Sequence, residues 1–314
     1  MSDTSITAII GDIANKKSCG GNETANTGKL GCLQLFGTPE HFIGVKKGYK
    51  IPATQDITLA WITGKVQDGT FTPIVGASAF EDMSAEDAYS TNSSGEKRIN
   101  LKGLPEYKLM FEEGHEFYRQ LARIETYKSM DFIILDDEGN WMLAQNSDGS
   151  YSGFRAGHVT PELTKRKVKG GDAESKSLVV QFLDRKQFDT NYAIIQADNI
   201  PFVPEEIPLV NGVNLAFINV PAAGVALDIS TVLSADNSTT IEGLTTLTDW
   251  YVTVDGVDNP VTAVTSSASG VYQLTVSTLS IGDVVVVDLA TATTSVVDSS
   301  GVLYRSTSIS KTVA

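Results

Sequence analysis

Short apolar runs separated by turn-forming residues dominate the first two thirds of the chain and predict a mainly β body. The run Phe132-Ile133-Ile134-Leu135 ends at an acidic turn through Gly139, and the next run, Trp141-Met142-Leu143-Ala144, ends at Asn146-Ser147-Asp148-Gly149. Two such runs joined by a glycine-containing turn are typical of a β-hairpin. Further strands are expected at 57–62, 178–183 and 192–197.

One segment departs from this pattern and predicts an amphipathic helix over 105–127. Its apolar residues recur at three- and four-residue spacing, which is typical of one buried helix face. Pro105 suits a first helical turn. The helix would expose Arg119 and Arg123 on its other side, where they could meet acidic groups of another copy. The predicted buried face consists of Tyr107, Met110, Phe111, Gly114, Phe117, Tyr118, Leu121 and Ile124.

The last third of the chain has a different pattern, in which short Val- and Thr-rich runs alternate with Gly, Asn, Asp and Pro. About seven short strands in about 100 residues are typical of an immunoglobulin-like sandwich, although the cysteine pair of antibody domains is absent here. Trp250 and Tyr251 are expected to form its aromatic centre. The strands are predicted near 215–220, 226–230, 239–241, 249–254, 270–276, 283–289 and 302–306.

A proline-rich segment at 201–208 separates the two patterns and is interpreted as a semi-rigid linker. The sequence therefore predicts a β body with one flanking helix at 1–200 and an immunoglobulin-like domain at 209–314. Charge changes at the same place, because no lysine or arginine occurs between Lys186 and Arg305.

The overall charge limits the function classes. The formal charge is −14, which argues against tightly bound nucleic acid, since phosphate contacts come from Lys and Arg. The first ten residues lack a basic and then apolar signal pattern, and no apolar stretch is long enough to cross a bilayer, so a non-secreted protein without membrane insertion is expected. Cys19 and Cys32 then fit reduced thiols better than a disulfide.

Two polar segments are candidates for contacts between copies. The insertion 81–98 is long and lacks local apolar anchors, and loops of this length in compact domains are usually functional or disordered. A basic run at 164–172 is either a solvated hairpin tip or a contact for the acidic surface of a neighbouring copy. The contact candidates in these segments are Asp82, Glu86, Asp87, Tyr89, Lys165, Arg166 and Lys167.

No pattern of catalytic or metal-binding residues is apparent. His41, His115 and His158 are far apart and lack metal-ligand spacing. Neither a nucleophile elbow nor a phosphate-binding glycine motif occurs. The acidic run 136–141 is read as a turn rather than a calcium loop, because Trp141 stands where the motif needs glycine. The sequence predicts no catalytic residues, no metal, no cofactor and no enzyme activity.

The order of elements resembles the tail tube proteins of long-tailed bacteriophages. The resemblance rests on the single predicted helix 105–127, the insertion 81–98 and the turn-rich run from Asp136 to Phe154. It implies that the body is a small β-barrel or sandwich with one flanking amphipathic helix. It also implies that six copies form a ring by continuing one another's sheets, and that rings stack into a hollow tube through which DNA passes as transient cargo. Several members carry a C-terminal immunoglobulin-like domain on the outside. The N-terminal region around Cys19 and Cys32 has no counterpart in this resemblance.

The resemblance also implies a location in the virion, assembly in the cytoplasm of the bacterial host, and other virion proteins as partners. An acidic lumen would suit passage of DNA, because it repels phosphates. Two other classes remain open. One is a different virion component, such as a capsid decoration or connector protein, and the other is a bacterial surface or carbohydrate-binding module.

Overall fold

The computed structural model describes residues 9–14, 36–91, 93–113, 117–118, 121–122, 130–165, 175–219, 221, 223–234, 236–289, 296–299 and 302–314. Most of these residues lie in strands, which confirms the predicted mainly β fold. The chain divides into two compact units. Unit 1 comprises 1–62 and 70–207, and unit 2 comprises 63–69 and 208–314.

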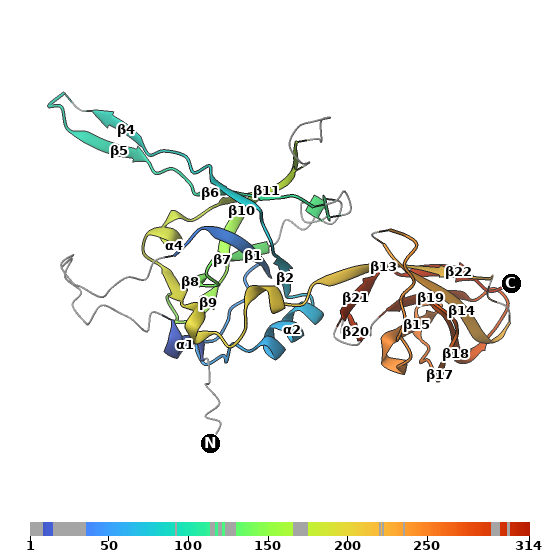
Figure 1. The fold of residues 1–314 in the computed structure, drawn as a ribbon. Coiled ribbons are helices and arrows are strands. Elements are labelled where there is room, and N and C mark those ends of the chain that lie inside the picture. Colours follow the sequence, from blue (N-terminus) through green and yellow to red (C-terminus); the bar gives the residue numbers. More distant parts are fainter. Residues whose placement is uncertain are drawn as a thin grey trace, which may run out of the picture. The chain divides into compact units, whose positions relative to one another are not determined.

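Unit 1 is built on one ten-stranded sheet that bends into a half-barrel (Figure 1). Its main path runs β12-β8-β7-β10-β11-β6-β3, while β1 pairs with β7 and β2, and β9 pairs with β8. The strands are β1 (Pro39–Lys46), β2 (Phe71–Ile74), β3 (Ala79–Asp82), β6 (Glu106–Phe111), β7 (Met130–Asp136), β8 (Trp141–Gln145), β9 (Tyr151–Ser152), β10 (Phe154–Lys165), β11 (Ser175–Phe182) and β12 (Tyr192–Ile195).

The long strand β10 joins the two halves of this sheet. Its first residues pair with β7, where Phe154 lies opposite Phe132, and from Ala156 onward it pairs with β11. Phe132, Phe154 and Phe182 are fully buried between these strands. The sheet closes around this core, and this explains why the central strands have continuous apolar runs.

The predicted hairpin of β7 and β8 is confirmed. Leu135 lies opposite Trp141, and Asp136 holds the turn between the strands. The buried Asp136 carboxylate accepts hydrogen bonds from the backbone N–H of Gly37 (2.6 Å) and of Asn140 (2.7 Å). Burial of this charged group is tolerable because several donors satisfy it.

The predicted helix at 105–127 is wrong at its start, where the structure has β6. Leu109 and Phe111 are buried, and Met110 between them is less buried, which is the two-residue period of a strand. β6 pairs with β11 on one side and β3 on the other, and these pairings decide the conformation. Phe117, Tyr118, Leu121 and Ala122 are helical. Arg119 and Arg123 lie outside the described residues.

The predicted strand at 57–62 is also wrong, because Leu59–Gln67 forms helix α2. The Thr58 hydroxyl accepts a hydrogen bond from the Trp61 N–H (3.1 Å), as an N-terminal helix cap does. Ile62 and Val66, four residues apart, are both buried. The β-branched residues favoured a strand, but the N-terminal cap and the four-residue spacing of buried side chains stabilise a helix here. Other short helices are α1 (Ile10–Ile13), α4 (Arg185–Asp189), η1 (Ala197–Asn199), η2 (Pro204–Glu206) and η3 (Leu247–Asp249).

The segment interpreted as a linker packs into unit 1 instead. Phe202, Pro204 and Ile207 are buried, and the Phe202 ring lies 6.1 Å from that of Trp141. Proline restricts the backbone but its ring is apolar, so a proline-rich segment can also serve as core.

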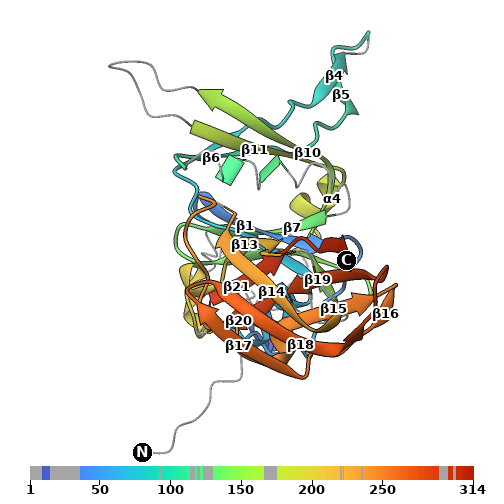
Figure 2. The same cartoon turned by 90° about the vertical axis from the view of Figure 1, so that its right-hand side faces the viewer.

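Unit 2 is a sandwich of two sheets (Figure 2). Lettered A to G along the chain, β13, β14, β18 and β17 give an A-B-E-D sheet, and β16, β15, β19 and β22 give a C′-C-F-G sheet, which is the immunoglobulin arrangement. β20 and β21 extend the first sheet beyond β13. The strands are β13 (Val210–Phe217), β14 (Gly224–Leu233), β15 (Trp250–Val254), β16 (Val257–Asp258), β17 (Ala263–Ala268), β18 (Val271–Leu279), β19 (Val284–Leu289), β20 (Val297–Ser299), β21 (Val302–Ser306) and β22 (Ile309–Thr312).

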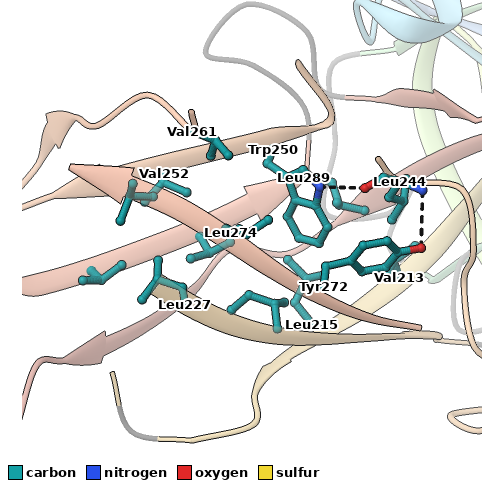
Figure 3. Packing of buried hydrophobic residues seen from close by; sticks show 14 of the residues in the cluster. Val213, Leu215, Leu227, Leu244, Trp250, Val252, Val261, Tyr272, Leu274 and Leu289 are labelled. Carbon is teal, nitrogen blue, oxygen red and sulfur yellow. Dashed lines mark hydrogen bonds between the residues drawn. The ribbon is translucent and has the colours of Figure 1, made fainter. Parts of the chain in front are cut away.

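The centre of unit 2 contains Trp250 and Tyr272, with ring centroids 5.3 Å apart (Figure 3). The Trp250 indole N–H donates to the Leu244 carbonyl (3.0 Å). The Tyr272 hydroxyl donates to the Ile241 carbonyl (2.8 Å) and accepts from the Leu244 N–H (3.3 Å). Tyr251 was the expected partner of Trp250, but it is only half-buried. The predicted strand at 239–241 is only an isolated bridge between Val232 and Thr240.

We expect Tyr272→Phe to lower the free energy of unfolding by about 1 to 3 kcal/mol, because the buried Leu244 N–H loses its acceptor and the Ile241 carbonyl keeps only the Thr231 hydroxyl (3.1 Å) as a donor. Urea unfolding monitored by tryptophan fluorescence measures the change. Tyr251→Phe is the matched control, since that side chain is half-exposed. Equal effects of the two substitutions would contradict the role given to the Tyr272 hydroxyl.

A buried carboxyl in unit 1 should make stability depend on pH. Burial raises the pKa of Asp131 above its ordinary value, although the Gly48 N–H donates to this side chain. The folded protein then binds the proton more tightly than the unfolded chain, so stability falls as pH rises from the unfolded pKa through the folded one. Asp131→Asn should therefore gain stability relative to the wild type between about pH 3 and pH 7. A pH-independent difference in urea unfolding would refute this.

Candidate self-association surface

The insertion at 81–98 forms part of a β-hairpin arm rather than an irregular loop. We define the arm as residues 84–104; it contains strands β4 (Ala88–Thr91) and β5 (Lys97–Leu101), which pair with each other as a separate two-stranded sheet. Tyr89 lies opposite Ile99, and Ser90 lies opposite Arg98. The arm connects β3 to β6 along the chain, and Figure 1 shows it projecting beyond β6.

The two faces of the arm differ in polarity. Tyr89 lies opposite Ile99, so these two side chains share one face, and they are 58% and 51% exposed. Leu101 is 70% exposed and lies opposite Ala88, beyond a register shift in the pairing. The opposite face is polar, and its Ser90 hydroxyl donates to Asn100 Oδ1 (2.8 Å). An isolated two-stranded hairpin is marginally stable in water. An arm with three exposed large apolar side chains therefore has the composition of a contact surface.

An ion pair holds the foot of the arm against unit 1. Arg185, at the start of α4, donates from Nη1 to Asp87 Oδ1 (2.6 Å) and to the Gly103 carbonyl (3.0 Å). The same Asp87 oxygen accepts from the Gly103 N–H (2.9 Å). Next to it, Lys102 pairs with Asp189 (3.0 Å). Both legs of the arm are thus bound to one short helix.

The legs also cross at very close range. A Cβ on Gly103 would lie 1.7 Å from the Ala85 carbonyl oxygen, so this position needs glycine. The Ala85 N–H donates to the Leu104 carbonyl (3.2 Å), and the Met83 N–H donates to the Glu106 carbonyl (2.8 Å). The foot is therefore a defined junction that sets where the apolar face of the arm points.

We expect Arg185→Ala to loosen this junction without unfolding unit 1, because the side chain is one-third exposed and lies outside the core. Backbone amide exchange at Ala85 and Gly103 should accelerate severalfold, as local opening becomes easier. Hydrogen-exchange mass spectrometry measures this, with Lys50→Ala as the control that breaks the exposed Lys50–Asp148 pair. Unchanged exchange at the foot would show that Arg185 does not hold the arm.

The structure brings some of the predicted contact residues together at the arm. Asp82 ends β3 and accepts a hydrogen bond from the Ser84 N–H (2.9 Å). Glu86 is exposed, Asp87 is engaged by Arg185, and Tyr89 lies on the apolar face. Burial and the charge of Asp82 raise the pKa of the adjacent Tyr107 to about 12, so this phenol stays neutral.

Of the three basic contact candidates, Lys165, Arg166 and Lys167, the structure describes only Lys165. Lys165 is the last residue of β10 and lies opposite Ser175 of β11. Arg166 and Lys167 lie outside the described residues. Sequence reasoning missed Ile99 and Leu101, although their two-residue spacing was a readable signal, and it missed Arg185, for which the sequence offers none.

Apart from the arm, unit 1 contains a concave region of about 510 Å³. This region is lined by His41, Asp137, Glu138, 139, 197 and 200–206. His41 is buried, its Nδ1 accepts from the Gly76 N–H (2.9 Å), and its Nε2 lies 3.6 Å from a Glu205 oxygen. Among the described residues, no three His, Cys, Asp or Glu side chains are grouped so as to hold a metal ion. The Gly76 N–H and Glu205 thus give the buried His41 ring structural partners.

None of the helices in the described part of the chain is both long and apolar enough to span a membrane. Comparison with models of known protein families gives no match to this chain, and no curated protein matches it either.

Proposed function

We propose that this protein is a structural virion protein of a bacteriophage, which assembles into stacked hexameric rings that form a tail tube. The observation that carries the proposal is the arm, which presents Tyr89, Ile99 and Leu101 to solvent from a fixed foot. Such a surface suits contact with a neighbouring copy, because burial of an exposed Tyr, Ile or Leu contributes about 1.5 to 3 kcal/mol each.

The half-barrel of unit 1 supports the same proposal. Its sheet path ends at β3, and among the described residues β6 is the only strand that pairs with β3. Another copy could continue this sheet, as rings of this class require. The outer strand carries Glu81 and Asp82, so the partner strand should bring positive charge. The basic candidates Lys165, Arg166 and Lys167 of a second copy have the matching sign.

Charge and chemistry are also compatible with a DNA conduit. Residues 1–204 contain 27 acidic and 22 basic residues, and 209–314 contain nine acidic and two basic residues. Net negative charge repels phosphates, and DNA would be transient cargo in the tube rather than a bound ligand. We propose no enzyme activity, and other virion proteins as the remaining partners.

The immunoglobulin arrangement of unit 2 favours one alternative, a bacterial surface-binding module, since such sandwiches are widespread among cell-surface domains. In the main proposal this unit lies on the outside of the tube. The other alternative is a different virion component, such as a decoration or connector protein. The form of the assembly distinguishes it from the main proposal, because only a tail tube protein is expected to form long tubes of stacked rings.

Two matched double variants of the arm test the proposal. Tyr89→Asp with Ile99→Asp places two charges on the apolar face, and Ser90→Asp with Asn100→Asp places two charges on the polar face of the same hairpin. We expect the first pair to reduce assembly at least tenfold, and the second to have a much smaller effect, in sedimentation velocity of the full chain. Equal assembly by both variants would refute the arm as the contact.

A further inference from the structure

The four edge strands of the unit 2 sandwich are not equally protected against pairing with another chain. Natural sheets protect their edges by keeping them short or by placing charges or proline on them. β16 has two residues and includes Asp258, β20 has three and includes Asp298, and β22 has four and includes Lys311. Each of these three edges therefore has a feature that discourages strand addition.

The fourth edge, β17, is neither short nor charged, and its pairing with β18 is regular from Ala263 to Ser266 before a register shift at Ala268. Its six residues read Ala-Val-Thr-Ser-Ser-Ala, and all except Val264 are exposed. Among the described residues, β18 is the only strand that pairs with β17, so the other side of β17 is open. The surrounding sequence is uncharged over the 24 residues 259–282. Exposed, uncharged and open along one side, β17 is a template for an added strand.

We propose that β17 pairs with β17 of a second copy, antiparallel and about a two-fold axis, so that two six-stranded sheets become one. An edge strand is complementary to itself in this arrangement, because each backbone donor meets an acceptor of its twin. The side chains are small, so neither copy obstructs the approach. We assign the added strand to a second copy, because the uncharged β17 edge lets two acidic units approach each other without charge repulsion at the contact.

Charge repulsion is the main obstacle to self-association of unit 2. Residues 208–314 carry nine acidic and two basic residues, so two copies that approach through charged surfaces repel each other. The stretch 259–282, which contains β17, is the longest run without a charged residue in 208–314. Pairing should therefore strengthen as salt screens the remaining repulsion. Binding of a basic partner at the same edge would instead weaken with salt.

Site-directed cross-linking of the full chain tests the pairing. In a Cys19→Ser, Cys32→Ser background, Thr265→Cys places a thiol at the centre of β17, and Asn211→Cys places one at an exposed position of β13 inside the same sheet. Directly opposite residues in paired strands have Cβ atoms about 4.5 to 5.5 Å apart, close to the separation a disulfide needs. Ser267→Cys places the thiol two residues further along β17 and tests for a shifted register of the β17–β17 pairing.

Under mild oxidation, we expect a covalent dimer from Thr265→Cys or Ser267→Cys at least tenfold in excess of that from Asn211→Cys, with a yield that rises between about 0.05 and 0.5 M NaCl. Equal yields at β17 and β13, or a yield at β17 that falls with salt, would overturn the proposal. The result is independent of the proposed tube. Tubes without the β17 dimer refute the strand pairing alone, and the dimer without tubes refutes the tube alone.

Discussion

Deleting the β4–β5 hairpin of the arm is expected to abolish assembly and leave a folded monomer. The deletion removes 88–101 and joins Asp87 to Lys102 through two glycines. Since β4 and β5 pair only with each other among the described strands, unit 1 loses no ladder of its main sheet. Asp87 and Gly103 are already hydrogen-bonded across the foot (2.9 Å), so a short connection can close the gap.

Sedimentation velocity should show a single small species at concentrations where the full chain assembles. Circular dichroism and thermal unfolding should match those of the undeleted monomer within a few degrees, because the deleted side chains are exposed. A matched variant keeps the arm but replaces Tyr89, Ile99 and Leu101 with serine. If that variant assembles normally while the deletion does not, the arm acts through its length rather than its apolar face.

Phe182→Ala is expected to lower the free energy of unfolding by about 3 to 5 kcal/mol, the largest effect of any single substitution proposed for unit 1. Phe182 is fully buried at the end of β11, and its ring centroid lies 4.9 Å from that of Phe188 and 5.5 Å from that of Tyr107. Removing it leaves a cavity between β11, β6 and α4, which the surrounding rings can fill only partly.

The matched control is Phe117→Ala. The predicted helix gave Phe117 a fully buried position, but the structure shows it only partly buried, with its ring 4.9 Å from that of Phe111. Its loss should cost about 1 to 2 kcal/mol, since less apolar area is exposed. Denaturant unfolding of both variants measures the difference. Equal losses, or a silent Phe182→Ala, would mean that the aromatic cluster does not stabilise unit 1 as described.

Local pattern sufficed where turn residues bound an apolar run on both sides. The β7–β8 hairpin was predictable because an acidic turn joins two apolar runs. Most strands of unit 2 were predictable from Val- and Thr-rich runs between turn residues, although β13, β14 and β15 pair with strands far away in sequence. β6 was mistaken for a helix because its pairing partner β11 lies about 70 residues away, and the stretch 105–111 fits both periods. α2 was mistaken for a strand because its cap, Thr58, is itself a β-favouring residue.

The candidate surface was predictable only in part. Length and polarity marked 81–98 as an insertion with an interaction role, and Tyr89 was among its contact candidates. Ile99 and Leu101 lie outside the predicted insertion 81–98, because local sequence does not say which strand leaves the core. The Arg185–Asp87 pair joins residues 98 positions apart, and that contact follows from the fold of unit 1 rather than from any local pattern.

Negative-stain imaging of the purified full-length chain tests the central claim most directly. The account predicts hollow tubes of stacked six-fold rings in the wild type and in the variant with charges on the polar face of the arm. It predicts dispersed small particles for Tyr89→Asp with Ile99→Asp. Dispersed monomers of the wild type at high concentration, or tubes that persist when the apolar face of the arm is charged, would contradict it.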